Sequence, residues 1–313
     1  MFQALRDKGI LGINRRNVDF TTRWNPRRLY PLVDNKLRTK AMCLEAGIPV
    51  PRLLGKAEHH FEIPKLLERI EALQDFVLKP ARGAMGNGIV VIVGQDNGVF
   101  SRAGGRKVSA GDLQYHASGI ISGLYALGGQ ADMAMVEERL IVHPELTQIV
   151  YDGVPDVRVI IYRGYPIMGM VRLPTHGSGG RANLHQGAIG AGIDLATGAM
   201  IFAIQRNRPV SMHPDTQAKL LGRVLPHFDR VLEIAVRAAD HTGLGYLGAD
   251  VVVDAALGPV ILEMNARPGL SIQLCNRSGI LPRVEAIDRL PDERPPFEER
   301  LEIVRELART WRP

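Results

Sequence analysis

Two carboxylates and one amide fall where a predicted β-hairpin would bring them together. Residues 248–265 contain two strand-like runs joined by a four-residue turn, and this turn pairs Asp250 with Glu263. Asn265 lies two residues further along, on the same face of its strand. Like charges opposite one another destabilise a sheet unless a cation offsets them, and oxygen ligands suit Mg²⁺. The alternative is that the two carboxylates meet basic side chains from elsewhere, and the residues leave both possibilities open.

A lysine followed by a glycine-rich loop is the second pattern that could do chemistry. The strand-like run 76–79 ends at Lys79, and the following loop contains Gly83, Gly86 and Gly88. Backbone N–H groups of such a loop can close over phosphates, while the lysine supplies a point charge. The loop lacks the Gly-Lys-Ser/Thr of a Walker A motif, and its glycines do not fit the dinucleotide fingerprint. An ordinary glycine turn is the alternative.

A second glycine-rich loop, residues 177–185, carries side chains that can hold an anion or an acyl phosphate. They are Arg181, Asn183 and His185, and a plain surface loop is the alternative. His185 could act as a base, but no nucleophile at a recognisable spacing accompanies it.

Two arginines flank a predicted hairpin over residues 156–173. With a two-residue turn, Arg158 pairs with Gly169, which puts Arg158 and Arg172 on opposite faces of the sheet. A single-residue bulge would reverse that arrangement.

The elements that must position these residues give an α+β pattern. Helices are expected at residues 34–45, 63–74, 109–127, 217–241 and 297–311. Strands are expected at residues 76–79, 89–93, 133–140, 156–162, 165–173, 248–254 and 259–265. Ser109 and Asp112 have the spacing of a capping box, and Pro226 is expected to break or kink its helix. The last helix has one apolar side, which favours packing against the protein's own body over docking on a membrane.

Composition narrows the class of protein. The 313 residues are 45% hydrophobic and 23% charged, which is typical of a globular chain and not of a disordered, collagenous or coiled-coil one. The net charge of +6 suits an anionic partner, but an aromatic content of 5% argues against stacking on single-stranded nucleic acid. Cys43 and Cys275 stand far apart without metal spacing, and no signal peptide or membrane span is evident. A reduced protein of the cytoplasm is expected.

In their order along the chain, these motifs resemble those of the ATP-grasp superfamily. Within it, the chain is most similar to the alpha-L-glutamate ligases that modify the C-terminus of a ribosomal protein. The matching segments are residues 34–40, 46–51, 77–80, 136–138, 156–158, 180–185, 248–250 and 262–269. The Glu-x-Asn-x-x-Pro-Gly at residues 263–269 is the most specific of them.

The resemblance implies an ATP-grasp fold in which two α+β lobes grip ATP. The expected divisions are an N-terminal extension (1–33), a small lobe with the glycine-rich loop (34–138), a large lobe with the metal site (139–290), and a linker with a C-terminal helix (291–313). Because so few residues precede the first motif, the full N-terminal domain of the glutamate ligases is expected to be missing.

The resemblance also implies a role for individual residues. The residues expected to contact the phosphates of ATP are Lys36, Lys79, Arg82, Gly83, Gly86 and Gly88. Glu138 and Arg139 would line the adenine, Asp156 would hold the ribose region, and Arg181 and Asn183 would lie by the γ-phosphate. Asp250, Glu263 and Asn265 would bind Mg²⁺, or Mn²⁺ in its place. The candidates for catalysis are Arg172 and Arg181, which would steady the transferred phosphoryl group, and Arg267, which would hold a substrate carboxylate.

The implied activity is an ATP- and Mg²⁺-dependent carboxylate–amine ligase that works through an acyl phosphate. We expect it to add glutamate, or a similar amino acid, to an acidic peptide or a small-molecule acceptor. A homo-oligomeric partner or another protein is a candidate for completing the substrate pocket. An ATP-grasp kinase and a nucleotide-binding scaffold without turnover are the alternatives. The basic stretch Arg15–Arg28 is not explained by this chemistry, and an acidic acceptor or partner is our hypothesis for it.

Overall fold

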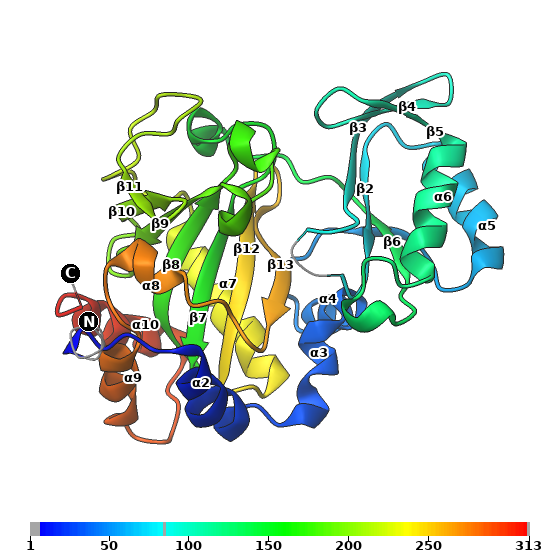
Figure 1. The fold of residues 1–313 in the computed structure, drawn as a ribbon. Coiled ribbons are helices and arrows are strands. Elements are labelled where there is room, and N and C mark those ends of the chain that lie inside the picture. The colour runs from blue at the N-terminus through cyan, green and yellow to red at the C-terminus, as the bar shows by residue number, and fades with distance from the viewer. Residues whose placement is uncertain (1–6, 84–85, 312–313) are drawn as a thin grey trace. The chain divides into compact units, whose positions relative to one another are not determined.

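The structure is a computed structural model that describes residues 7–83 and 86–311 (Figure 1). Its internal contacts divide the chain into two compact units. Unit 1 holds the described residues of 1–34, 38–50 and 142–313, and unit 2 holds those of 35–37 and 51–141. The helix that we expected to open the small lobe therefore belongs for most of its length to unit 1.

Unit 2 is built on a six-stranded antiparallel sheet with the order β1-β6-β2-β3-β4-β5. The strands are β1 (Leu53–Ala57), β2 (Phe76–Pro80), β3 (Val90–Asp96), β4 (Val99–Arg102), β5 (Lys107–Ser109) and β6 (Ala134–Glu137). Helices α5 (Ile63–Ile70) and α6 (Ala110–Ile121) pack on this sheet (Figure 1). Their apolar sides share one core with Phe76 and Phe100, whose rings meet edge to face at 5.8 Å.

The predicted capping box at the start of α6 is confirmed. The backbone N–H of Asp112 donates to Ser109 Oγ at 3.1 Å, and the N–H of Ser109 donates to Asp112 Oδ2 at 2.8 Å. The helix ends at Ile121, earlier than expected, and α5 likewise ends at Ile70. Sequence reasoning missed β1, β4 and β5, which are short and lie at or near the sheet edges.

Unit 1 is built on a seven-stranded antiparallel sheet with the order β11-β10-β9-β8-β7-β12-β13. The strands are β7 (Asp156–Tyr162), β8 (Tyr165–Leu173), β9 (Ile189–Ile193), β10 (Met200–Gln205), β11 (Arg208–Val210), β12 (Tyr246–Asp254) and β13 (Gly258–Asn265). The helices are α2 (Ile13–Arg15), α3 (Pro31–Asp34), most of α4 (Lys36–Glu45), α7 (Phe228–Thr242), α8 (Ile272–Asn276), α9 (Leu281–Asp288) and α10 (Phe297–Ala308).

Helices cover both faces of this sheet. Helix α7 lies against β7, β12 and β13 on one side, and α8 lies against β8, β9 and β10 on the other (Figure 1). The prediction of a helix from residue 217 was wrong, because α7 begins only at Phe228. Pro226 cannot supply a ladder N–H, and His227 has a left-handed backbone with φ of 54°, so the chain before Phe228 runs as turns.

The termini of unit 1 pack against its core. Phe20 is buried with its ring 5.7 Å from that of Tyr162 and 5.5 Å from that of Tyr246, so the expected N-terminal extension is an integral layer of this unit. Leu301 and Val304 of α10 are buried in the same core, which confirms that this helix packs on its own body. None of the helices in the described residues is both long and apolar enough to cross a membrane.

Candidate active site

The candidate metal ligands lie on one face of the β12–β13 hairpin. Asp250 pairs with Glu263 as predicted, and Gly248 pairs with Asn265. The predicted turn was one residue too long, because Asp254 pairs with Gly258. A bulge after Asp250 shifts the register by one residue and so restores the predicted partner.

The β7–β8 hairpin brings Arg158 and Arg172 to the same face, so the prediction of opposite faces was wrong. A bulge between Ile160 and Ile161 makes Arg158 pair with Met170 instead of Gly169. One added residue reverses the side to which every later side chain points. Arg158 therefore reaches Asp250 on the adjacent strand β12, and Arg172 reaches it from β8, across β7.

These side chains form a charge network centred on Asp250, which is fully buried. Arg158 donates from Nε to Asp250 Oδ1 at 2.7 Å and from Nη2 to Oδ2 at 2.6 Å. Arg172 donates from Nε and Nη2 to the two oxygens of Asp156 at 2.5 and 2.7 Å, and from Nη2 to Asp250 Oδ2 at 2.8 Å. For Asp250, the alternative of a carboxylate that meets basic side chains is therefore observed.

Burial and charge act in opposite directions on the two aspartates. Burial alone would raise the pKa of Asp250, but the attraction of Arg158 and Arg172 is larger and holds this pKa well below its usual range. At Asp156 burial outweighs the attraction of Arg172 and raises the pKa to about 6. The same arginines therefore lower the pKa of one carboxyl group, while burial raises that of the other.

Glu263 and Asn265 are partly buried oxygen-bearing residues on this face, and they lie beside Asp250, whose two oxygens are already bonded to arginines. Asn265 Nδ2 lies 3.5 Å from Asp250 Oδ2 and 3.5 Å from Glu263 Oε1, so three oxygen-bearing side chains converge. Turning the amide over presents its oxygen in place of Nδ2. No group of three or more His, Cys, Asp or Glu residues in the described part of the chain is arranged for a metal. Water molecules and substrate phosphates would have to complete the coordination of the cation, as they usually do for Mg²⁺ in proteins.

In unit 2, Lys79 and Glu137 form a buried ion pair. Lys36 Nζ donates to the carbonyl of Gly83 at 2.6 Å, so this lysine lies beside the start of the glycine-rich loop. Sequence reasoning singled out Glu138 and missed Glu137. The pairing of β2 with β6 is what brings Glu137 to Lys79. It puts Glu137 opposite Val77, and Val77 lies two residues before Lys79 on the same face of β2.

The glycine-rich loop is anchored at both ends. The buried Asp132 accepts hydrogen bonds from the N–H of Arg82 at 2.9 and 3.0 Å and from the N–H of Met133 at 2.7 Å. At the far end, the carbonyl of Gly88 is 2.8 Å from His116 Nε2. Gly86 and Gly88 have φ of 76° and 75°, and a Cβ at Gly88 would lie 2.6 Å from the ring of Tyr125. Ala84 and Met85 of the predicted loop lie outside the described residues.

Replacing Asp132 with alanine is expected to loosen the loop and weaken ATP binding. The backbone N–H groups of Arg82 and Met133 lose their acceptor, which costs about 1–3 kcal/mol for each unsatisfied group. We expect KM for ATP to rise on the order of tenfold, because the phosphate-facing backbone loses its fixed geometry. ADP release against ATP concentration measures the change, with Asp96→Ala at an exposed site as the matched control. An unchanged KM would show that Asp132 does not position the loop.

Other predicted residues have partners within their own unit. Glu138 Oε1 accepts from the N–H of Arg52 at 2.6 Å, and Arg139 pairs with Asp75 at 2.9 Å. Asn183 Oδ1 accepts from the N–H of His185 at 3.0 Å and so shapes its own loop.

Arg181 and Arg267 are both exposed in unit 1. The guanidinium of Arg267 lies 5.3 Å from the centre of the Tyr30 ring. Neither arginine contacts Asp250 or its partners among the described residues, so the structure does not bring them into the charge network.

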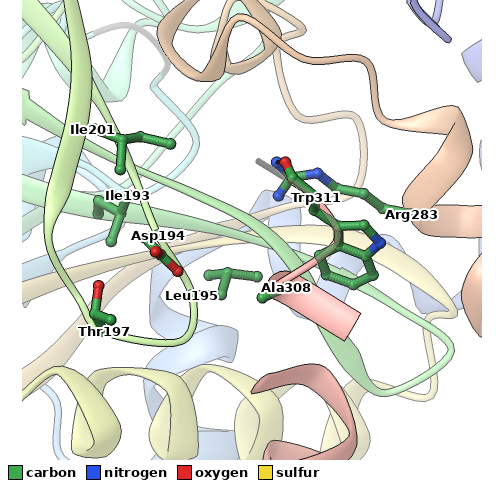
Figure 2. A pocket seen from close by; sticks show the side chains of 8 residues that line it. All are labelled: Ile193, Asp194, Leu195, Thr197, Ile201, Arg283, Ala308 and Trp311. Carbon is green, nitrogen blue, oxygen red and sulfur yellow. Dashed lines mark hydrogen bonds between the residues drawn. The ribbon is translucent and has the colours of Figure 1, made fainter. Parts of the chain in front are cut away.

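A cavity of about 390 Å³ in unit 1 contains none of the predicted site residues (Figure 2). Its lining consists of Ile193, Asp194, Leu195, Thr197, Ile201, Arg283, Ala308 and Trp311. Arg283 donates from Nη1 to the carbonyl of Ile167 at 2.8 Å and stacks on Trp311, and burial lowers its pKa to about 10. These contacts tie α9 to β8 and to the C-terminal segment.

Comparison with known proteins gives one family match. A family model described as sugar-transfer associated ATP-grasp matches residues 15–289, which include parts of both units. A search of curated proteins found no match.

Several solved structures resemble the chain at low identity. The ATP-grasp ligase PsnB in complex with a minimal precursor is 19% identical, with a TM-score of 0.45, over 85% of this chain and 63% of that one. The VanG D-Ala:D-Ser ligase from Enterococcus faecalis is 16% identical, with a TM-score of 0.46, over 90% and 63%. The RimK domain ATP-grasp protein from Sphaerobacter thermophilus is 15% identical, with a TM-score of 0.41, over 80% and 66%. The chain thus spans less than two thirds of the length of each.

Proposed function

Since the chain belongs to the sugar-transfer associated ATP-grasp family, we propose that it is an ATP- and Mg²⁺-dependent carboxylate–amine ligase. The observation that carries the proposal is the single face of unit 1 on which Asp250, Glu263 and Asn265 meet Arg158 and Arg172. Carboxylates for a divalent cation beside guanidinium groups for phosphate oxygens are what phosphoryl transfer requires.

The residues of unit 2 would hold the nucleotide. Lys36 and Lys79 supply positive charge at the glycine-rich loop and at the strand that leads into it. Asp132 fixes the start of the loop, and we infer that N–H groups further along the loop would bind phosphate oxygens.

The residues of unit 1 would act on the transferred phosphoryl group. Bound Mg²⁺, held by Asp250, Glu263 and Asn265, would offset the negative charge of the phosphates. Asp156 accepts hydrogen bonds from both Nε and Nη2 of Arg172 and so fixes the orientation of its guanidinium. We therefore assign Asp156 the role of a positioning residue, in addition to its expected place near the ribose. Arg181 and Asn183 remain our candidates for contacts with the γ-phosphate.

The proposed reaction has two steps. A carboxylate oxygen of one substrate attacks the γ-phosphorus, the bond to the β,γ-bridging oxygen breaks, and ADP leaves behind an acyl phosphate. The amine of the second substrate then attacks the acyl carbon, inorganic phosphate leaves, and the amine loses a proton to solvent as the amide forms. Catalysis comes from positioning and electrostatics, because developing charge on the phosphoryl oxygens is met by fixed cations.

We further propose glutamate as the added amino acid and an acidic peptide or small acid as its acceptor. The support is the resemblance of the ordered motifs to the glutamate ligases and the chain's net charge of +6. Arg267, with its exposed guanidinium held over Tyr30, is the candidate that would bind a substrate carboxylate.

The test is product analysis with a panel of acids and amines. We expect ADP release that requires Mg²⁺, an acid and an amine together, and a product that mass spectrometry finds heavier by one amino-acid residue. Chelation of the metal should stop release. Phosphorylation of a hydroxyl compound without an amine would favour the kinase instead, and nucleotide binding without ADP release across the panel would favour the scaffold.

A further inference from the structure

Three consecutive backbone carbonyls that follow the candidate metal ligand Asn265 are held by side chains from the N-terminal part of the chain. They are the carbonyls of Ala266, Arg267 and Pro268, and the donors are Asn25 and Arg16. The β13 strand ends at Asn265, so no ladder partner fixes the backbone beyond it. We call residues 265–269 the site loop and residues 16–25 the positioning segment.

Asn25 takes the place of a ladder partner where β12 and β13 separate. Its Oδ1 accepts from the N–H of Tyr246 at 3.0 Å, and its Nδ2 donates to the carbonyls of Tyr246 at 2.6 Å and Ala266 at 3.0 Å. The side chain is almost fully buried, with 2% of its surface exposed. Three buried bonds from one amide leave little freedom to the backbone next to Asn265.

Arg16 holds the next two residues. Its Nη1 donates to the carbonyl of Pro268 at 3.0 Å and to that of Arg267 at 3.4 Å. Asn17 Oδ1 accepts from the other side of the same guanidinium, from Nη2 at 2.8 Å and Nε at 3.1 Å, and so orients it. Arg16 also opens a π-helix (Arg16–Thr22), a rare form that occurs often at functional sites.

The segment is docked independently of these contacts. Within it, Phe20 packs between two buried tyrosines. The chain that leads into it is also fixed, because the N–H of Leu11 donates to Gln273 at 2.8 Å and its carbonyl accepts from Gln273 at 3.0 Å. Removing the guanidinium of Arg16 therefore leaves the segment in place and frees only the carbonyls of Arg267 and Pro268. The family match begins at residue 15, so it includes the whole segment.

We propose that the positioning segment sets the geometry of the metal and acceptor side of the site. By fixing the carbonyls on either side of Arg267, it determines where the side chains of Asn265 and Arg267 are directed. Part of the basic N-terminal stretch thus acts through the site loop and not through an anionic partner. The inference rests on the proposed function in one respect only, which is that the loop serves a divalent cation and a substrate carboxylate.

The experiment compares Arg16→Ala with Arg15→Ala. Arg15 is the neighbouring arginine, and it is exposed and paired with Asp19 at 3.0 Å, without contact to the site loop. Mn²⁺ binding in the presence of a non-hydrolysable ATP analogue is measured from the electron paramagnetic resonance signal of the free ion. We expect about tenfold weaker Mn²⁺ binding for Arg16→Ala, the size seen when groups that orient metal ligands are lost, and no change for Arg15→Ala. In turnover, KM for the acceptor and the Mg²⁺ concentration needed for half-maximal activity should both rise for Arg16→Ala and stay unchanged for Arg15→Ala.

A second pair of variants keeps the proposal testable if Arg16→Ala folds poorly. Arg16→Lys retains a charge but loses the fork, and Asn17→Ala leaves Arg16 intact but unoriented. Both should weaken Mn²⁺ binding less than Arg16→Ala does, with unchanged unfolding midpoints. Equal Mn²⁺ affinity in Arg16→Ala, Arg15→Ala and the unaltered protein would overturn the proposal. If no ligase product formed but Arg16→Ala still bound Mn²⁺ more weakly than Arg15→Ala, the result would count against the proposed reaction and not against the role of Arg16.

Discussion

Replacing Glu263 with glutamine is expected to abolish turnover and leave the protein folded. Glu263 stands opposite Asp250 on β13, and it is only partly buried, whereas Asp250 is fully buried and bonded to two arginines. Glutamine keeps the shape and one acceptor oxygen but removes the charge, so the cation loses a carboxylate ligand. We expect kcat to fall on the order of 10³-fold, which is the size of effect found when an enzyme loses one group that stabilises charge developing in the transition state. ADP release measures it.

The matched control is Glu285→Gln, which removes the same charge from an exposed position of α9. It should behave like the unaltered protein in both ADP release and thermal unfolding. If Glu263→Gln released ADP at the original rate and with the original Mg²⁺ dependence, Glu263 would have no place in the metal site. A large fall in the unfolding midpoint would instead indicate a structural role.

Replacing Lys79 with alanine should eliminate ATP-dependent turnover and destabilise unit 2. Lys79 and Glu137 are both almost fully buried, with side-chain exposures of 4% and 3%, and they pair with one another. Removal of the lysine leaves a buried carboxylate without its cation, which costs about 3–5 kcal/mol. The loss of activity would then mix two causes, a missing phosphate contact and a weakened fold.

A double variant separates these causes. Lys79→Met together with Glu137→Gln removes both charges and keeps both lengths, so we expect most of the lost stability to return, since well-packed neutral side chains replace buried ion pairs at little cost. ATP-dependent turnover should stay absent if Lys79 has its proposed role, because the charge proposed to meet the phosphates is gone. Denaturant unfolding and ADP release are measured on all three variants. Recovery of turnover in the double variant would assign Lys79 a purely structural role.

Local sequence patterns were sufficient to predict structural elements whose interacting residues lie close together along the chain. The β7–β8 hairpin occupies the predicted residues, because Arg163 and Gly164 adopt the positive φ values of 50° and 84° that a two-residue turn needs. The capping box of α6 depends on residues only three apart. The order of the ATP-grasp motifs also identified the superfamily before any contact was known, and the family match agrees.

Bulges are where local reasoning failed. The one between Ile160 and Ile161 reversed the side of Arg158, and the one after Asp250 compensated for a turn of the wrong length. These bulges have no signature in the local sequence, yet each changes which face every later residue occupies. The pairing of Asp250 with Glu263 was therefore predicted correctly for a reason that was partly wrong.

The sequence by itself determined the family, the hairpin that carries Asp250 and Glu263, and the residue types available for a metal and for phosphates. Only the tertiary structure decided which charges neutralise one another. Asp250 with Arg158 and Arg172, Lys79 with Glu137, and Arg16 with the site loop are each brought together across the sheet or from distant parts of the chain. Such pairs depend on strand order and register, which arise from the packing of the whole core and are not encoded in any local spacing.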